Sequence, residues 1–162
     1  MKTLIIYDSK YGCTRDCVLH LQKLLHDDVT VCSVRDKLPS LNHFDTVLIG
    51  GSVYMGAIQK RITRFCKKNL KTLLGKKVGL FIGCYTPVDT SGYIYGFFPN
   101  ELLSHAVCKS IFGGEMRYET MNVIYKKLFQ SLQKIEGFRA GFKEPHIEYE
   151  EIEHFAKVIE AI

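Results

Sequence analysis

The 162-residue sequence predicts a three-layer α/β/α sandwich around a five-stranded parallel sheet, formed as a single domain over residues 1–162. Apolar runs alternate five times with segments that repeat apolar residues at helical spacing, which is typical of a parallel sheet with helices on both faces. Several of the runs are almost continuously apolar, as expected for strands buried on both sides. A chain of this length can bury a sizeable core.

The first half of the chain is expected to supply three strands and two helices. The apolar run "TLIIYD" (3–8) predicts a buried strand, and "TRDCVLHLQKLLHD" (14–27) predicts a helix from its apolar spacing. The segments "VTVCSV" (29–34), rich in β-branched residues, and "FDTVLIGGS" (44–52) predict the next two strands. A helix over 58–74 follows, with four apolar residues on one side, Ile58, Ile62, Phe65 and Leu70.

The second half continues the alternation. "KKVGLFIGC" (76–84) predicts the fourth strand, and "FPNELLSHAV" (98–107) predicts a short helix with proline in its first turn. "CKSIFGGEM" (108–116) predicts the fifth strand, and a long helix is expected over 118–135. A last helix over 147–162 is expected to turn four apolar residues inward, Ile152, Phe155, Ile159 and Ile162.

Composition and charge narrow the class of protein. The N-terminal run lacks a cleavage site, and the apolar runs are too short to span a bilayer, so we expect a cytoplasmic protein. The six cysteines form no CxxC pair and have no metal-ligand spacing, so we expect free thiols and no metal. The net charge is +5, and residues 117–143 carry six basic and two acidic residues, whereas 144–162 carry six acidic residues and one lysine. The basic segment suits either a peripheral membrane contact or an ordinary solvated helix face, and we expect no nucleic acid as partner.

Three polar loops follow the first, third and fourth strands. They read "SKYGCT" (9–14), "GGSVYMGAI" (50–58) and "GCYTPVDTSGYIYG" (83–96). Ligands of open parallel sheets bind beyond the carboxyl ends of the strands, which is where these loops lie. In the first loop, hydroxyls of Ser9 and Thr14, a tight turn at Gly12 and the first amides of a helix suit an anion such as phosphate. The alternative is an ordinary helix cap without a ligand.

Several nucleotide and catalytic motifs are missing. No G-x-x-x-x-G-K-[ST] occurs, and no G-x-G-x-x-G follows the first strand. The segment "GGSVY" lacks the second glycine of a G-x-S-x-G nucleophile elbow. The third strand ends in Gly-Gly-Ser, where a phosphoacceptor domain needs an aspartate. Tyrosines gather instead on the second and third loops, and a phosphate site beside aromatic surface suits a planar mononucleotide.

The first loop and its strand, "LIIYDSKYGCT", resemble the phosphate-binding signature of the flavodoxin-domain family, with Ser9, Gly12 and Thr14 at matching places and Tyr11 where threonine is usual. "VLIGGSVYMG" and "GLFIGCYT" resemble the second and third flavin loops. The resemblance is greatest to the branch of menaquinone-dependent protoporphyrinogen dehydrogenases, which shares the "FGGEMRY" strand and the basic segment after it. It implies a flavodoxin-like fold with strand order 2-1-3-4-5 and flavin mononucleotide (FMN) as cofactor.

The resemblance also implies a set of cofactor-binding residues and no catalytic side chain, because the flavin carries the chemistry. The phosphate contacts are Ser9, Lys10, Tyr11, Gly12, Cys13 and Thr14. The second loop contributes Ser52, Val53, Tyr54, Met55 and Gly56, with either Tyr54 or Met55 packed on the flavin ring. The third contributes Cys84, Tyr85 and Thr86, with Tyr93 or Tyr95 covering the other face of the ring.

Three functions are compatible with these residues. The first is an electron carrier that exchanges electrons with a redox partner protein or a small donor or acceptor. The second is a flavin-dependent oxidoreductase acting on protoporphyrinogen or a quinone, which the basic character of the chain favours over a simple acidic shuttle. The third is a flavodoxin-fold module that binds a phosphate-bearing ligand without redox chemistry.

Overall fold

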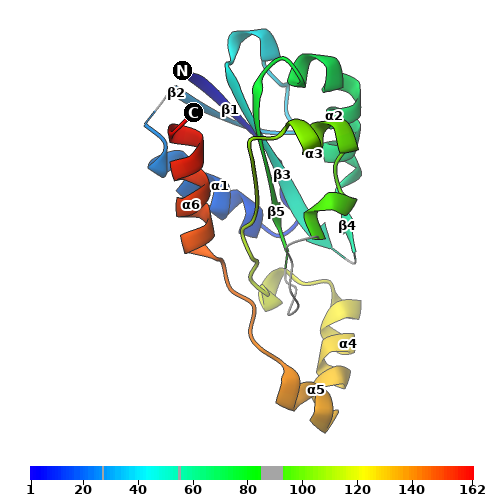
Figure 1. Ribbon diagram of the computed structural model, residues 1–162. Coiled ribbons are helices and arrows are strands. Elements are labelled where there is room, and N and C mark those ends of the chain that lie inside the picture. The colour runs from blue at the N-terminus through cyan, green and yellow to red at the C-terminus, as the bar shows by residue number, and fades with distance from the viewer. Residues whose placement is uncertain (27, 55, 85–92) are drawn as a thin grey trace.

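The computed structural model describes residues 1–26, 28–54, 56–84 and 93–162, and its centre is a parallel sheet (Figure 1). The sheet runs β2-β1-β3-β5-β6, and a two-residue strand β4 pairs antiparallel to β3. The strands are β1 (Lys2–Asp8), β2 (Asp28–Ser33), β3 (Thr46–Tyr54), β4 (Ala57–Ile58), β5 (Lys77–Gly83) and β6 (Cys108–Ile111). Without β4, this is the expected five-stranded order 2-1-3-4-5, so the flavodoxin-like fold is confirmed.

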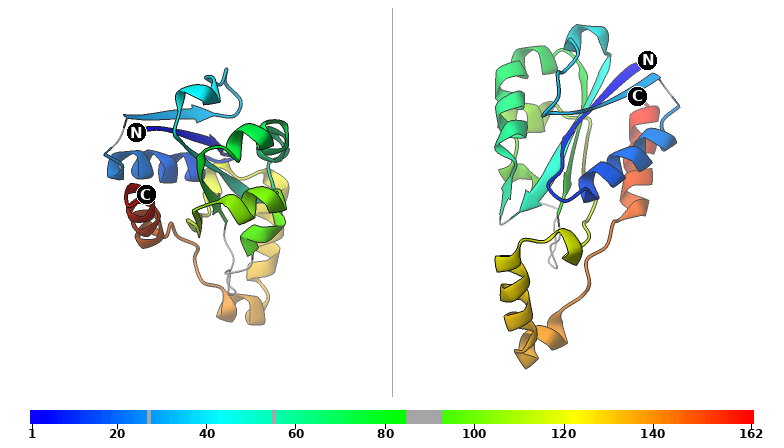
Figure 2. Two further views of the ribbon diagram at one scale, coloured as in Figure 1. Left: turned by 45° about the horizontal axis from the view of Figure 1, so that its top comes forward. Right: turned by 180° about the vertical axis from the view of Figure 1, so that it is seen from behind.

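Helices cover both faces of the sheet. On one face lie α1 (Cys13–Leu24) and α6 (Tyr149–Glu160), and on the other lie α2 (Lys60–Leu73) and α3 (Asn100–His105), as Figure 2 shows from two further directions. Each face has its own apolar core, because the strands alternate their side chains between the two layers. The expected three-layer sandwich is therefore present.

The core under α1 and α6 is organised around aromatic rings. Phe81 on β5 stacks on Phe112 with ring centroids 4.7 Å apart, and both meet Phe155 of α6 edge to face. The neighbouring strand makes room with a glycine, because a Cβ at Gly50 would lie 2.2 Å from the ring of Phe81. The glycine pair at the end of "VLIGG" thus has a packing reason as well as a place beside the second loop.

Several expected element boundaries are wrong, of which four bear on the rest of the structure. The helix expected over 58–74 begins at Lys60, because Ala57–Ile58 folds back on β3 as β4. The strand expected over 108–116 ends at Ile111, since Gly113 has φ +70° and pairs with the returning chain at Ile147. The helix expected over 118–135 is a 3-10 turn, Tyr118–Thr120, followed by a separate α-helix. Ile162 lies beyond the end of α6 and is 43% exposed rather than inward-facing.

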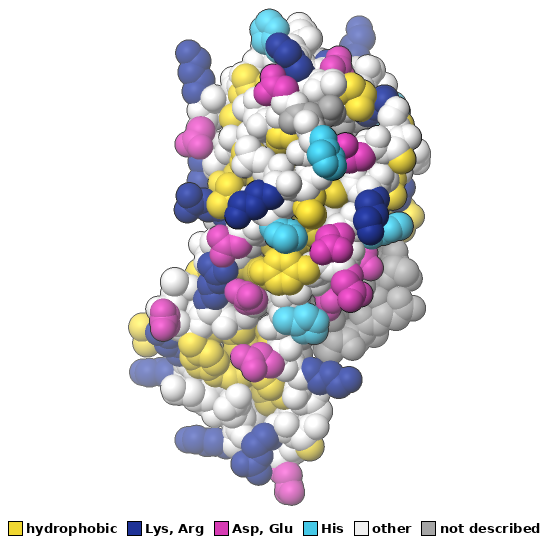
Figure 3. Space-filling view, turned by 90° about the vertical axis from the view of Figure 1, so that its left-hand side faces the viewer, with side chains coloured by type: hydrophobic (Ala, Val, Ile, Leu, Met, Phe, Trp, Pro, Cys, Tyr) yellow, Lys and Arg dark blue, Asp and Glu magenta, His cyan; other side chains and the backbone are white. Residues whose placement is uncertain are grey.

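Residues 118–142 form an arm that projects beyond the carboxyl edge of the sheet (Figure 1). It contains α4 (Val123–Gln133) and α5 (Glu136–Gly141), and aromatic contacts of Phe129 with Tyr118, Phe138 and Phe142 hold it together. Its outer side exposes several large apolar residues, Val123, Ile124, Leu128 and Ile135, of which Ile124 is 72% exposed. Figure 3 shows basic and apolar side chains side by side on this lower part of the molecule. None of the helices in the described residues combines the length and apolar composition needed to cross a bilayer.

Candidate functional site

Residues from all three polar loops line one cavity of about 200 Å³ beyond the carboxyl ends of the central strands. Of the sequence-predicted residues it includes Ser9, Lys10, Tyr11, Cys13, Thr14, Ser52, Val53, Tyr54 and Cys84. Because β1, β3 and β5 are adjacent and parallel, their loops must emerge at the same edge. The topology therefore brings together residues that lie up to 75 positions apart in the chain.

The first loop carries hydrogen-bond donors without partners. Gly12 has φ +89°, a conformation that favours glycine, and its amide donates to Ser9 Oγ at 3.1 Å. The amides of Lys10, Tyr11 and Cys13 donate to no acceptor among the described residues. Thr14 is 1% exposed, and its Oγ1 has no hydrogen-bond partner in the described part of the chain. A buried donor such as the Thr14 hydroxyl is rarely left unpaired. Together with the free amides at the N-terminus of α1, it would fit a phosphate.

The second loop supplies an aromatic wall. The ring of Tyr54 lies edge to face with Tyr11 at 5.9 Å and with Tyr125 of α4 at 5.2 Å, measured between centroids. Lys10 Nζ lies 3.6 Å from the centroid of the Tyr54 ring, a cation–π contact. Burial and hydrogen bonding to Tyr11 and Tyr125 raise the pKa of Tyr54, so this ring is a neutral phenol near neutral pH. At the base of the loop, Gln59 Nε2 donates to Ser52 Oγ.

Some predicted site residues lie elsewhere. Gly56, with φ +75°, turns the chain between β3 and β4 and does not line the cavity. Tyr93 is 38% exposed and packs edge to face on Phe97, outside the cavity lining. Met55, Tyr85 and Thr86 lie outside the described residues. The roles of these residues toward a flavin ring stay predictions.

Sequence reasoning missed a fourth segment of the site. The chain after β6 adds several lining residues, Gly114, Glu115, Met116, Arg117 and Met121, and the returning chain adds Pro145. The signal that could have found them is the glycine pair of "FGGEM", because the positive φ of Gly113 ends the strand and turns the chain across the first loop.

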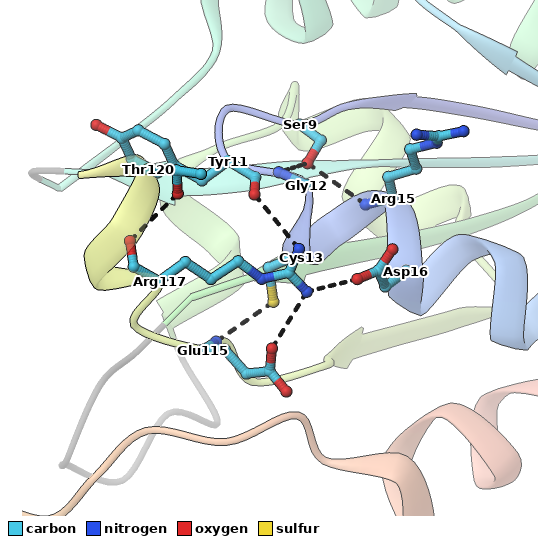
Figure 4. A network of polar contacts seen from close by, with 9 residues as sticks. All are labelled: Ser9, Tyr11, Gly12, Cys13, Arg15, Asp16, Glu115, Arg117 and Thr120. Atoms are coloured by element: carbon cyan, nitrogen blue, oxygen red, sulfur yellow. Dashed lines mark hydrogen bonds and ion pairs between the residues drawn. The ribbon is translucent and has the colours of Figure 1, made fainter. Parts of the chain in front are cut away.

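Arg117 ties this segment to the first loop (Figure 4). Its Nη2 donates to Asp16 Oδ2 in the first turn of α1 and to Glu115 Oε2 at 3.2 Å, and its Nη1 lies 3.5 Å from the carbonyl oxygen of Tyr11. A Cβ on Gly12 would come within 3.0 Å of the same Nη1, so the guanidinium lies directly on the loop backbone. Arg117 thus neutralises two carboxylates beside the unpaired amides of the first loop.

Cys13 has an unusual environment at the start of α1. The pKa of its thiol is lowered to about 7, chiefly by a hydrogen bond from Cys17 and further by the amide of Glu115, whereas partial burial acts in the opposite direction. Burial raises the pKa of Cys84, on the third loop, to about 11. Among the described residues, no group of three or more histidine, cysteine or acidic side chains is placed to hold a metal ion.

Together, the fold and the site define an α/β protein with a loop of unpaired hydrogen-bond donors and an aromatic wall at the carboxyl edge of its sheet. A family described as the flavodoxin domain matches residues 4–140, and the chain belongs to this family. No curated protein sequence matched the chain.

Solved flavodoxins share the fold at low sequence identity. A flavodoxin from Streptococcus pneumonia TIGR4 aligns over 99% of both chains with a TM-score of 0.56 and 14% identity. Flavodoxin 1 from Bacillus cereus aligns over 88% of this chain and 100% of its own, with a TM-score of 0.54 and 18% identity. The flavodoxin of Megasphaera elsdenii aligns over 67% and 84%, with a TM-score of 0.55 and 18% identity.

Proposed function

We propose that the chain binds FMN at the carboxyl edge of its sheet and exchanges electrons with a redox partner through the bound flavin. The observation that carries the proposal is the unpaired donor set of the first loop, namely the Thr14 hydroxyl and the amides of Lys10, Tyr11 and Cys13. The similarity to solved flavodoxins supports it, since these include a flavodoxin in an oxidised state and one in a two-electron reduced state.

The residues present fit this cofactor. The first loop would hold the phosphate, and Arg117 would offset the negative charge of Asp16 and Glu115 beside it. A cavity of about 200 Å³ is smaller than the ~300–1,000 Å³ of pockets that enclose a whole drug-sized ligand, so it suits the phosphate end, with the ring near Tyr54 at the mouth. The flavin supplies the electron-transfer chemistry, and the protein supplies binding, orientation and electrostatics.

The test is reconstitution of the purified protein. Incubation with FMN and removal of excess should leave about one flavin per chain, with quenched flavin fluorescence and a reduction potential different from that of free FMN. If the protein retains no flavin, the proposal is refuted, and the remaining function is that of a module that binds a phosphate-bearing ligand without redox chemistry. All six cysteines are free thiols, which suits the reducing cytoplasm that we propose as the location.

A second candidate is an oxidoreductase acting on protoporphyrinogen or a quinone. The exposed apolar residues of the arm favour it, because the arm contacts the site through the rings of Tyr125 and Tyr54 and its apolar surface would suit a carrier or substrate held at a membrane surface. Turnover of protoporphyrinogen with a menaquinone analogue, together with co-sedimentation of the protein with anionic vesicles, would support it. Electron exchange with soluble proteins, without turnover of protoporphyrinogen, would instead support the electron carrier.

A further inference from the structure

The positive charge of this protein is concentrated in one helix. The sequence of α2, "KRITRFCKKNLKTL", holds six basic residues and no acidic one, and all six are exposed. The net charge of the whole chain is +5, so the remainder of the molecule sums to −1. The basic segment at 117–143 contributes less, because two glutamates offset its six cations.

This concentration of charge does not help α2 to form. Basic residues three or four apart repel each other along the helix surface, as Lys60, Arg64 and Lys68 do, and no glutamate or aspartate intervenes. The first turn carries Lys60 and Arg61 where the helix dipole favours acidic side chains. Helix stability therefore does not account for this pattern, whereas a dense group of exposed cations attracts anionic partners.

The charged face of α2 borders a groove. Residues of α2 and of the segment 34–42 line a groove of about 760 Å³, with Arg35, Arg61, Arg64 and Lys68 in its wall and no acidic residue in the described lining. The side chain of Asp8 is fully buried behind two of these arginines, with Oδ1 2.7 Å from Arg35 Nε and Oδ2 3.7 Å from Arg61 Nη1. This single carboxylate accepts a hydrogen bond from Arg35 and lies within ion-pair distance of Arg61, and it leaves the groove positive.

The groove begins next to the flavin site. Arg35 Nη2 donates to the carbonyl oxygen of Ser9, the first residue of the phosphate loop, at 3.3 Å. The second flavin loop leads through β4 directly into α2. A partner that binds along α2 would therefore lie beside the cofactor.

We propose that the α2 face, defined as Arg35, Arg61, Arg64, Lys68 and Lys71, is the docking surface for an acidic redox partner protein. The inference rests on the proposed electron-transfer function. The α2 cations are spread over a helix of 14 residues, about 21 Å long, which matches several carboxylates on a protein surface rather than one small anion. The outward positions of α2 lack the exposed apolar residues that suit a bilayer and the aromatic rings that stack on nucleic-acid bases.

The test compares two charge-reversal variants that lower the net charge equally. The α2 variant is Arg64→Glu with Lys68→Glu, and the matched control in the arm is Lys127→Glu with Lys134→Glu; all four residues are exposed. The probes are two haem proteins of opposite charge, an acidic b-type cytochrome and the basic cytochrome c. The Kd of each complex is measured by calorimetry at low salt with apoprotein and with FMN-loaded protein, and electron transfer from the reduced holoprotein is followed by stopped flow. Each ferric haem takes one electron and becomes ferrous.

We expect the α2 variant to raise the Kd for the acidic cytochrome at least ~10-fold and to slow electron transfer similarly, with a change below ~3-fold for the control. The difference should vanish near 0.5 M salt because exposed charges are then screened. The basic cytochrome should lose no affinity in the α2 variant. Circular dichroism checks folding, and Arg64→Gln with Lys68→Gln replaces the α2 variant if charge reversal disturbs the helix.

Equal losses in both variants, or none in the α2 variant, would overturn the docking surface. So would α2-dependent binding of phosphatidylglycerol vesicles or a single-stranded oligonucleotide that is tighter than binding of the acidic cytochrome, or self-association of the chain through α2 at low salt. Apoprotein that binds the acidic cytochrome through α2 but takes up no FMN would refute the proposed function and leave the docking surface standing. Flavin uptake without α2-dependent docking would refute the docking surface alone.

Discussion

Replacement of Thr14 by valine separates the stability of the protein from its affinity for FMN. The hydroxyl of Thr14 is buried, faces Gly83 at the end of β5, and has no hydrogen-bond partner among the described residues. Valine has nearly the same shape and a similar helix propensity, so Thr14→Val removes the hydroxyl and little else. The unpaired hydroxyl lowers the stability of the apoprotein, and it contributes to FMN binding only when the phosphate accepts a hydrogen bond from it.

The two effects have opposite signs. A buried polar group without a partner costs about 1–3 kcal/mol, so Thr14→Val should raise the free energy of unfolding of the apoprotein by roughly that amount. For a chain of this size, each kcal/mol corresponds to a rise of about 2–4 °C in Tm. A hydrogen bond to the charged phosphate contributes about 1.5–3 kcal/mol, and its loss should raise the Kd for FMN roughly 10- to 150-fold.

Thr46 offers a matched control at the other end of the sheet. It begins β3, is 1% exposed, and its Oγ1 is likewise unpaired in the described structure. Thr46→Val should therefore stabilise the apoprotein by a similar amount and leave the Kd for FMN unchanged. Apoprotein Tm by calorimetry and Kd by flavin fluorescence quenching measure the two quantities. A lower Tm for apo Thr14→Val, or an unchanged Kd for FMN, would refute the assignment of this hydroxyl to the phosphate.

Three further predictions concern neighbouring features. Arg117→Gln leaves Asp16 and Glu115 unneutralised beside the first loop, so the Kd for FMN should rise about 10-fold. The Kd for riboflavin, which has no phosphate, should not change. Equal losses of affinity for both flavins would mean that Arg117 only positions its segment. The pKa of Cys13 is lowered to about 7, so the rate of its alkylation by iodoacetamide in the apoprotein should increase through pH 7 as the thiolate forms. Bound FMN should slow this reaction. An alkylation rate independent of pH between 6 and 8 would contradict the lowered pKa. Gly50→Ala places a Cβ 2.2 Å from the ring of Phe81 and should lower the free energy of unfolding by about 1–3 kcal/mol, measured by urea titration. An unchanged urea midpoint would contradict the close packing of Gly50 against this ring.

The sequence predicted the fold and the first loop well because both follow from local patterns. The apolar runs of β1, β3 and β5 are nearly continuous, and only a sheet covered on both faces accounts for three such runs. The first loop is contiguous, so its hydroxyls, glycine and helix amides could be recognised together in "SKYGCT".

The boundaries and the fourth segment of the site depend on contacts between distant residues. The end of β6 is decided by the pairing of Gly113 with Ile147, 34 positions later, and nothing in "CKSIFGGEM" indicates that partner. Arg117 reaches the first loop only because this turn redirects the chain across it. Periodicity describes one element at a time, so it does not report which loop a long side chain will meet.

The charge distribution also depends on both local sequence and distant contacts. The long basic segment of the sequence is 117–143, in which cations and glutamates are mixed. The shorter α2 has the higher charge density, and the fold adds Arg35 from the segment after β2 to it through the buried carboxylate of Asp8. Because Asp8 ends β1 and is followed at once by Ser9, the same strand end pairs with Arg35 and Arg61 and leads into the first loop. Two consecutive residues, Asp8 and Ser9, thus join the proposed docking face to the first loop. The arm reaches the same cavity by a separate route, through Met121 in its lining and the ring of Tyr125 against Tyr54.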